Sequence, residues 1–235
     1  MLPRKTSAPI FCYVTDRAGL RSPEPRDALR ALLDCIASAA AAGVPWIQLR
    51  EKDLAARDLA RLTSAAIDRC APAHPGVANS PSSRTRIFLN DRLDVAIAGR
   101  AAGVHLGENS LPVDEAKRLL QNLSPEKRPA EFLVGVSCHS LAFAQAATAA
   151  GADYIFFGPI FPTPSKQIYG PAQGLQRLAE VCGAVNIPVL AIGGINMENA
   201  ADCLDSGASG IAAIRLFQQS SQLQAAAGFL RSFNP

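Results

Sequence analysis

The 235-residue sequence lacks any apolar run long enough to cross a membrane. A transmembrane helix needs about 20 consecutive apolar residues, whereas Arg, Asp or Lys interrupts every candidate run. The N-terminal residues, MLPRKT, also lack the apolar core of a secretory signal peptide. We therefore expect a cytoplasmic protein that has no membrane partner.

An excess of charge of one sign is missing as well. The 23 Lys and Arg residues nearly balance the 20 Asp and Glu residues, and both signs are scattered along the chain. Nucleic-acid binding usually requires basic residues gathered on one face, so we expect no nucleic-acid partner. The six cysteines are widely spaced and form no C-x-x-C pair, a pattern that favours reduced thiols over a zinc or redox site.

The sequence does contain a regular alternation of two segment types. Short β-branched or aromatic runs alternate with Ala- and Leu-rich segments of helical period. Expected strands begin at Ile10, Val44, Arg86, Gly103, Phe132, Asp153, Pro188 and Gly210. Expected helices begin near Pro25, Ala56, Arg92, Pro112, Leu141, Ala172, Met197 and Gln222. Eight such units predict a single (β/α)8 (TIM) barrel domain over residues 1–235, with a core at about 10–217. A doubly wound sheet would usually carry a glycine-rich turn after its first strand, and none is visible.

Polar residues follow most of the expected strands. They are Gln48, Arg50 and Lys52, then Asn90 and Asp91, Ser137 and His139, and Thr163, Ser165 and Lys166. Active sites of TIM barrels are built at the C-terminal ends of the strands, so we expect these side chains to line one rim. The loop from Pro159 to Pro171 is long enough to close over a ligand there.

A second group of residues predicts a phosphate site. Gly193 and Gly194 end the seventh strand, and Ile214 and Arg215 follow the eighth. The loops after these two strands commonly bind phosphate in TIM barrels, through backbone amides. Taken alone, the Gly-Gly pair is equally compatible with an ordinary tight turn.

Several of these residues also have plain structural interpretations. Residues 50–53 are compatible with an exposed charge cluster, and His105 is typical of a packed core histidine. Asp91 is suited to cap the helix that follows it. His139 differs from these, because an imidazole at the rim titrates near neutral pH and can move protons.

Six ordered motifs carry a family resemblance. They are QLREKD (48–53), LNDRLDVA (89–96), GVHLGE (103–108), GVSCHS (135–140), ADYIFFGPIFPTPSK (152–166) and PVLAIGGI (188–195). Together they resemble thiamine phosphate synthases and TenI-like thiazole tautomerases. In the synthases, a pyrimidine methyl diphosphate loses pyrophosphate, and the nitrogen of a thiazole phosphate captures the resulting cation. The resemblance thus implies a phosphorylated thiazole as the small-molecule substrate.

The resemblance also implies roles for individual residues. It assigns catalysis to His139, Lys52 and Lys166, and substrate contacts to Gln48, Arg50, Asn90, Ser137, Thr163 and Ser165. The phosphate contacts, Gly193, Gly194, Ile214 and Arg215, follow from the loop positions described above. In a synthase only, Asp91 would bind Mg²⁺. A homo-oligomer is compatible with the sequence, which does not decide the oligomeric state.

Three departures from the synthase pattern affect the choice of activity. Ser110 stands where the synthase motif H-L-G-Q-x-D has a second Mg²⁺ carboxylate, although Glu108 lies close enough in sequence to replace it. Residues 163–168 depart from the lid motif T-x-T-K-x-D, and Arg215 replaces a serine. These changes favour a TenI-like thiazole tautomerase, in which His139 moves a proton on thiazole carboxylate phosphate without a metal cofactor. Thiamine phosphate synthase, which requires Mg²⁺, is the alternative, and a non-catalytic regulatory barrel is the second alternative.

Overall fold

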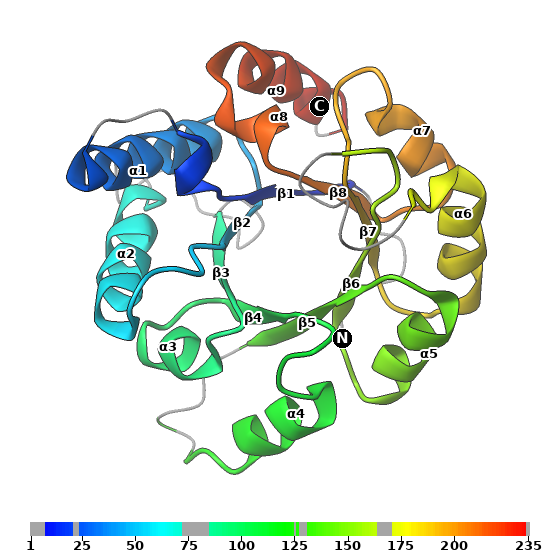
Figure 1. Ribbon diagram of the computed structural model, residues 1–235, viewed down its shortest axis with the longest axis horizontal. Helices are drawn as coiled ribbons and strands as arrows, with labels where there is room; N and C mark the ends of the chain where they lie inside the picture. Colours follow the sequence, from blue (N-terminus) through cyan, green and yellow to red (C-terminus); the bar gives the residue numbers. More distant parts are fainter. Residues whose placement is uncertain are drawn as a thin grey trace.

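A closed barrel of eight parallel strands forms the centre of the computed structural model (Figure 1). The structure describes residues 8–20, 24–71, 85–124, 126, 131–163 and 171–233. The strands pair in chain order, and β8 closes the barrel against β1 with Ile10 opposite Gly210. Helices surround the sheet on the outside. The predicted (β/α)8 fold is confirmed.

The strands begin within three residues of the expected positions. They are β1 (Ile10–Val14), β2 (Trp46–Leu49), β3 (Arg86–Asn90), β4 (Gly103–Leu106), β5 (Leu133–Cys138), β6 (Tyr154–Phe157), β7 (Val189–Ile192) and β8 (Gly210–Ala213). The helices are η1 (Arg17–Gly19), α1 (Pro25–Ala41), α2 (Ala56–Arg69), α3 (Leu93–Ala98), α4 (Val113–Gln121), α5 (Leu141–Ala149), α6 (Gly174–Ala184), α7 (Ala200–Asp205), α8 (Arg215–Gln218) and α9 (Ser220–Phe233). The short α8 was not predicted as a separate element.

Strand alternation divides the apolar side chains into two layers. Phe11 and Tyr13 of β1 belong to the larger layer between the sheet and the helices, whereas their neighbours in sequence point into the barrel. Inside the barrel, the Trp46 ring packs against those of Phe88 and Tyr154, with ring centroids 4.7 and 4.8 Å apart. These rings fill the barrel interior, so the polar side chains at the strand ends lie above a packed apolar core.

The described part of the chain also tests two expectations about composition. No helix there is long and apolar enough to span a bilayer. All six cysteines are free thiols. Among the described residues, no group of three or more His, Cys, Asp or Glu side chains is arranged to hold a metal ion. Any metal site must therefore draw on fewer side chains from this part of the chain.

Candidate active site

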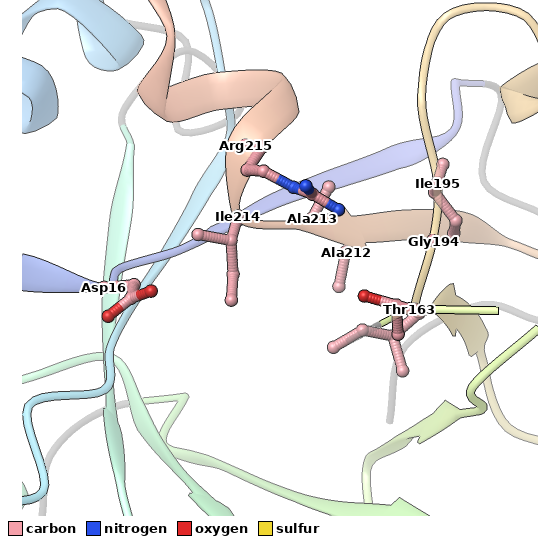
Figure 2. A pocket seen from close by; sticks show the side chains of 10 residues that line it. Asp16, Thr163, Gly194, Ile195, Ala212, Ala213, Ile214 and Arg215 are labelled. Carbon is pink, nitrogen blue, oxygen red and sulfur yellow. The ribbon is translucent and has the colours of Figure 1, made fainter. Parts of the chain in front are cut away.

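The loops after β7 and β8 enclose a cavity of about 240 Å³, here named the phosphate cavity. Its lining residues are Asp16, Thr163, Ile192, Gly193, Gly194, Ile195, Ala212, Ala213, Ile214 and Arg215. Figure 2 shows Arg215 extending over this cavity from the start of α8, with Thr163 on another wall. The cavity thus contains all four residues that the sequence assigned to phosphate.

Backbone conformation fixes the turn at the end of β7. Gly193 and Gly194 have φ values of +98° and +69°, which side-chain-bearing residues rarely adopt. A Cβ atom on Gly194 would also lie 2.7 Å from the Cβ of Phe161. The amide of Phe161 donates to the carbonyl of Gly193 at 3.0 Å. The two glycines therefore let the segment after β6 pack closely against the turn.

Two backbone amides in the phosphate cavity have no acceptor among the described residues and can donate to a ligand. Among the described residues, the amides of Gly194 and Arg215 donate to no other residue, and Arg215 has no ion-pair partner. Because α8 has only four residues, its dipole adds little, and the guanidinium supplies most of the positive charge. This arrangement suits a phosphate group.

A smaller cavity of about 60 Å³, here named the central cavity, lies at the middle of the barrel mouth. Its lining residues are Val14, Gln48, Arg50, Asn90, His105, Ser137, Phe156, Ile192 and Ile214. It shares Ile192 and Ile214 with the phosphate cavity, so the two adjoin. Gln48 donates to the Asn90 side chain at 3.0 Å. The structure thus brings together four of the predicted substrate contacts, Gln48, Arg50, Asn90 and Ser137.

A buried carboxylate anchors the backbone at Arg50. Glu51 accepts from the Thr15 hydroxyl at 2.6 Å and from the Arg17 amide at 3.2 Å, and the same Thr15 oxygen accepts from the Arg50 amide at 3.0 Å. Burial raises the pKa of Glu51, against the opposing effect of these hydrogen bonds. The interpretation of residues 50–53 as one exposed cluster is therefore wrong at Glu51, although Lys52 is exposed.

Lys52 and Asp91 line a third cavity, of about 290 Å³, beside the central one. Asp91 has φ +61°, and its side chain turns away from α3, which has no side-chain cap. The expectation that Asp91 caps this helix is therefore wrong. Its Oδ1 instead accepts from the Gly107 amide at 2.9 Å and from the Ser110 hydroxyl at 2.5 Å, and its Oδ2 accepts from Asn90 at 2.6 Å.

These contacts limit how Asp91 can bind a metal. A carboxylate has about four lone-pair positions, and three are filled, both of those on Oδ1 included. One position remains, on Oδ2. The residues therefore fit Mg²⁺ only through a single Asp91 oxygen, with water and a diphosphate supplying the other ligands, which is a common mode for this ion.

The remaining predicted residues are placed less centrally. Nδ1 of His139 lies 2.5 Å from the Gly158 carbonyl oxygen, which can only accept, so Nδ1 carries a proton. Among the described residues that line the three cavities, His139 is absent. Ser165 and Lys166 lie outside the described residues, as does most of the expected lid. His105 is 2% exposed, as expected of a packed core histidine, yet it also lines the central cavity.

Sequence reasoning overlooked one charged residue of the site. Asp16 lines the phosphate cavity directly after β1, and its backbone is held by Gln218, which accepts from the Asp16 amide at 3.2 Å and donates to its carbonyl at 2.9 Å. Its place after a strand end is the signal that identified the other rim residues, and it applies here equally.

Known proteins resemble the chain over nearly its whole length. The family model described as thiamine monophosphate synthase matches residues 22–217. The chain belongs to this family. A thiamine-phosphate synthase of Methanoculleus marisnigri is 43% identical over 203 residues, which cover 86% of this chain and 87% of the relative. One of Roseiflexus sp. is 38% identical over 213 residues, covering 91% and 80%.

A solved structure agrees with these relatives. The thiamine phosphate pyrophosphorylase of Pyrococcus furiosus superimposes with a TM-score of 0.74 at 29% identity, covering 95% of this chain and 94% of the other. The chain is thus an enzyme of thiamine biosynthesis. The names of the relatives favour the synthase alternative over the tautomerase hypothesis.

Proposed function

We propose that this family member is a thiamine phosphate synthase, which joins hydroxymethylpyrimidine diphosphate to thiazole phosphate and releases pyrophosphate. The observation that carries the proposal is that two adjoining cavities, each with a cation free of ion pairs among the described residues, share Ile192 and Ile214. Two anionic substrates would bind with their charges apart and their reacting atoms close together. Proximity of this kind lowers a bimolecular barrier substantially.

The phosphate cavity would hold the thiazole phosphate. Its phosphate would accept from the Gly194 amide and from the Arg215 guanidinium, and Thr163 would contact the same substrate. All five of these residues, Thr163, Gly193, Gly194, Ile214 and Arg215, line this one cavity. The thiazole ring would then lie toward Ile192 and Ile214, facing the central cavity.

The central cavity would hold the reacting end of the pyrimidine diphosphate. The bond between the pyrimidine methylene carbon and the diphosphate oxygen breaks, and its electron pair leaves with pyrophosphate. The thiazole nitrogen lone pair then forms the new C–N bond. Arg50 would stabilise the charge that gathers on the departing group, while Gln48 and Asn90 would orient the substrate.

Lys52 and Asp91 would act at the outer end of the diphosphate, because they line the third cavity next to Asn90. Asp91 would hold Mg²⁺, and Lys166 would complete the cationic surroundings. When bound, Mg²⁺ supplies positive charge that neutralises the diphosphate. His139 has no assigned step in this reaction, and it carries the tautomerase alternative instead.

One assay separates the candidate functions. Purified protein is mixed with both synthase substrates and Mg²⁺, and separately with the thiazole carboxylate phosphate tautomer. We expect pyrophosphate and thiamine phosphate in equal amounts from the first mixture. Turnover of the tautomer alone would restore the tautomerase hypothesis, and binding without turnover of either would indicate a non-catalytic barrel.

A further inference from the structure

A chain of three hydrogen-bonded side chains runs from the barrel interior to the central cavity. The Tyr154 hydroxyl on β6 lies 3.3 Å from Nδ1 of His105 on β4. Nε2 of the same imidazole lies 2.9 Å from the Ser137 hydroxyl on β5. Ser137 and His105 line the central cavity, whereas Tyr154 belongs to the packed interior of the barrel.

The fold is built to admit the Tyr154 ring. Gly135 faces it from the neighbouring strand, and a Cβ atom on Gly135 would lie 2.1 Å from the ring carbon that bears the hydroxyl. The residue is 1% exposed, and burial raises the pKa of Tyr154 far above its usual value. The phenol therefore keeps its proton, which must be donated to an acceptor.

The acceptor for this proton fixes the state of His105. Among the described residues, the Tyr154 hydroxyl has one hydrogen-bond partner, Nδ1 of His105. If Nδ1 carried a proton, the buried phenol proton would have no acceptor, at a cost of about 1–3 kcal/mol. Nδ1 therefore accepts, and Nε2 carries the ring proton and donates it to Ser137. Packing against Phe156, with centroids 4.0 Å apart, restrains the imidazole.

This tautomer of His105 leaves the hydroxyl proton of Ser137 free to point into the central cavity. Because the Ser137 oxygen accepts from Nε2, its own proton is left to donate elsewhere, and the hydroxyl has no other hydrogen bond among the described residues. We propose that Tyr154 and His105 are positioning residues that fix Ser137 as a hydrogen-bond donor to the bound substrate. The identity of the acceptor rests on the proposed function. We identify the acceptor of the Ser137 proton as the oxygen that departs with pyrophosphate, because Arg50 lines the same cavity.

Removal of the Tyr154 hydroxyl should allow His105 to adopt either neutral tautomer. In Tyr154→Phe, the His105 ring is free to carry its proton on Nδ1 and to accept from Ser137 through Nε2. The serine proton would then point away from the substrate in part of the molecules. We expect kcat to fall about tenfold, less than the ~10²-fold or greater loss typical of a missing donor to a developing anion, with KM nearly unchanged.

The tautomer can be observed without any turnover. The chain has only three histidines, and ¹⁵N NMR distinguishes protonated from unprotonated ring nitrogens, with a His105→Gln variant assigning the signals. We expect the Nε2–H form of His105 in the wild type and a shift toward Nδ1–H in Tyr154→Phe. Tyr13→Phe is the matched control, because it removes another buried phenol hydroxyl, bonded to Gln218 at 2.9 Å, and should leave the tautomer unchanged.

Two results would overturn the proposal. One is a wild-type His105 that carries its proton on Nδ1, or a tautomer that does not change in Tyr154→Phe. The other is an equal loss of kcat from Tyr154→Phe in wild-type and Ser137→Ala backgrounds, because the hydroxyl must act through Ser137. A tautomer shift in a protein that turns over neither substrate would support the positioning chain and reject the proposed function, so the two failures are distinguishable.

Discussion

The phosphate cavity and the central cavity adjoin, yet they are built from different kinds of groups. The phosphate cavity presents backbone amides, apolar side chains and one guanidinium, together with the side chains of Asp16 and Thr163. The central cavity presents side chains that hydrogen-bond one another, such as Gln48 with Asn90 and His105 with Ser137. A backbone site depends on conformation, whereas a side-chain network depends on the identity of each member. The first is suited to hold a substrate and the second to act on it.

This contrast extends to the elements behind each cavity. Close packing of residues 159–161 supports the glycine turn, so that turn cannot relax independently. The network on the opposite side joins the ends of β2, β3 and β4 through Gln48, Asn90, Asp91 and Gly107. We therefore expect substitutions in the central cavity to change mainly kcat, and substitutions in the phosphate cavity to change mainly KM.

The largest effect should follow from Arg50→Gln. In the proposed reaction, Arg50 faces the charge that develops on pyrophosphate, so we expect kcat to fall by about 10²–10³-fold, the range for one lost donor in the transition state. Pyrophosphate release under saturating substrates measures this. Arg57→Gln, on the exposed surface of α2, is the control of equal charge change. Similar losses in both variants would show that Arg50 acts only through net charge.

Gly194→Ala should damage the opposite cavity through the backbone. The new Cβ must approach Phe161 at a φ of +69°, so we expect KM for thiazole phosphate to rise about tenfold or more, with a smaller change in kcat. Gly151→Ala is the control, because Gly151 has φ +90° with open space around it. That variant should lose about 1–2 kcal/mol of stability, the cost of the left-handed conformation, while KM stays unchanged. Equal KM values in both variants would contradict the assignment of the turn.

The sequence predicted the barrel and the position of its rim because both depend on local patterns. Strand ends marked Gln48, Arg50 and Asn90 as rim residues, and the structure gathers them in one cavity. The same local reasoning could not show that Glu51 folds inward among exposed neighbours. Nor could it find the contact between Tyr154 and His105, which are 49 positions apart and meet through the barrel register.

The choice between activities was harder to predict for a related reason. The loss of a carboxylate at Ser110 favoured the tautomerase, but one substitution says nothing of the rest of the site. The relatives favour the synthase, and the structure shows what the serine does instead, since its hydroxyl occupies Oδ1 of Asp91. A left-handed backbone at Asp91, invisible in the sequence, turns that carboxylate toward Ser110 and away from α3.

A smaller effect should follow at Ser110, where the side-chain network can be changed into a metal site. In Ser110→Asp, a second carboxylate would face Asp91, and the two would need a cation between them. We expect Mn²⁺ to bind at least about tenfold more tightly without substrate, which corresponds to about 1.4 kcal/mol. Electron paramagnetic resonance of free Mn²⁺ measures this. Asp91→Asn in the same background should abolish the gain, and an unchanged affinity in Ser110→Asp would refute the account of Ser110.

The smallest effect concerns Glu51, which binds Thr15 and Arg17 and, through Thr15, holds the amide of Arg50. Burial raises the pKa of Glu51, so folding favours its protonated form. The raised pKa of the Glu51 carboxyl group therefore stabilises the folded protein at pH values below the pKa of this group in the unfolded chain. This stabilisation is lost as the pH rises through the pKa of the group in the folded protein. In Glu51→Gln, the side chain at this position is neutral at every pH, so this variant should not show the loss.

We expect the stability advantage of the wild type over Glu51→Gln to shrink as pH rises from about 4 to 7, by less than the ~1 kcal/mol of one typical hydrogen bond. Urea unfolding of both proteins across this range measures the difference. An advantage that grows with pH would mean that the contact with Arg17 outweighs burial.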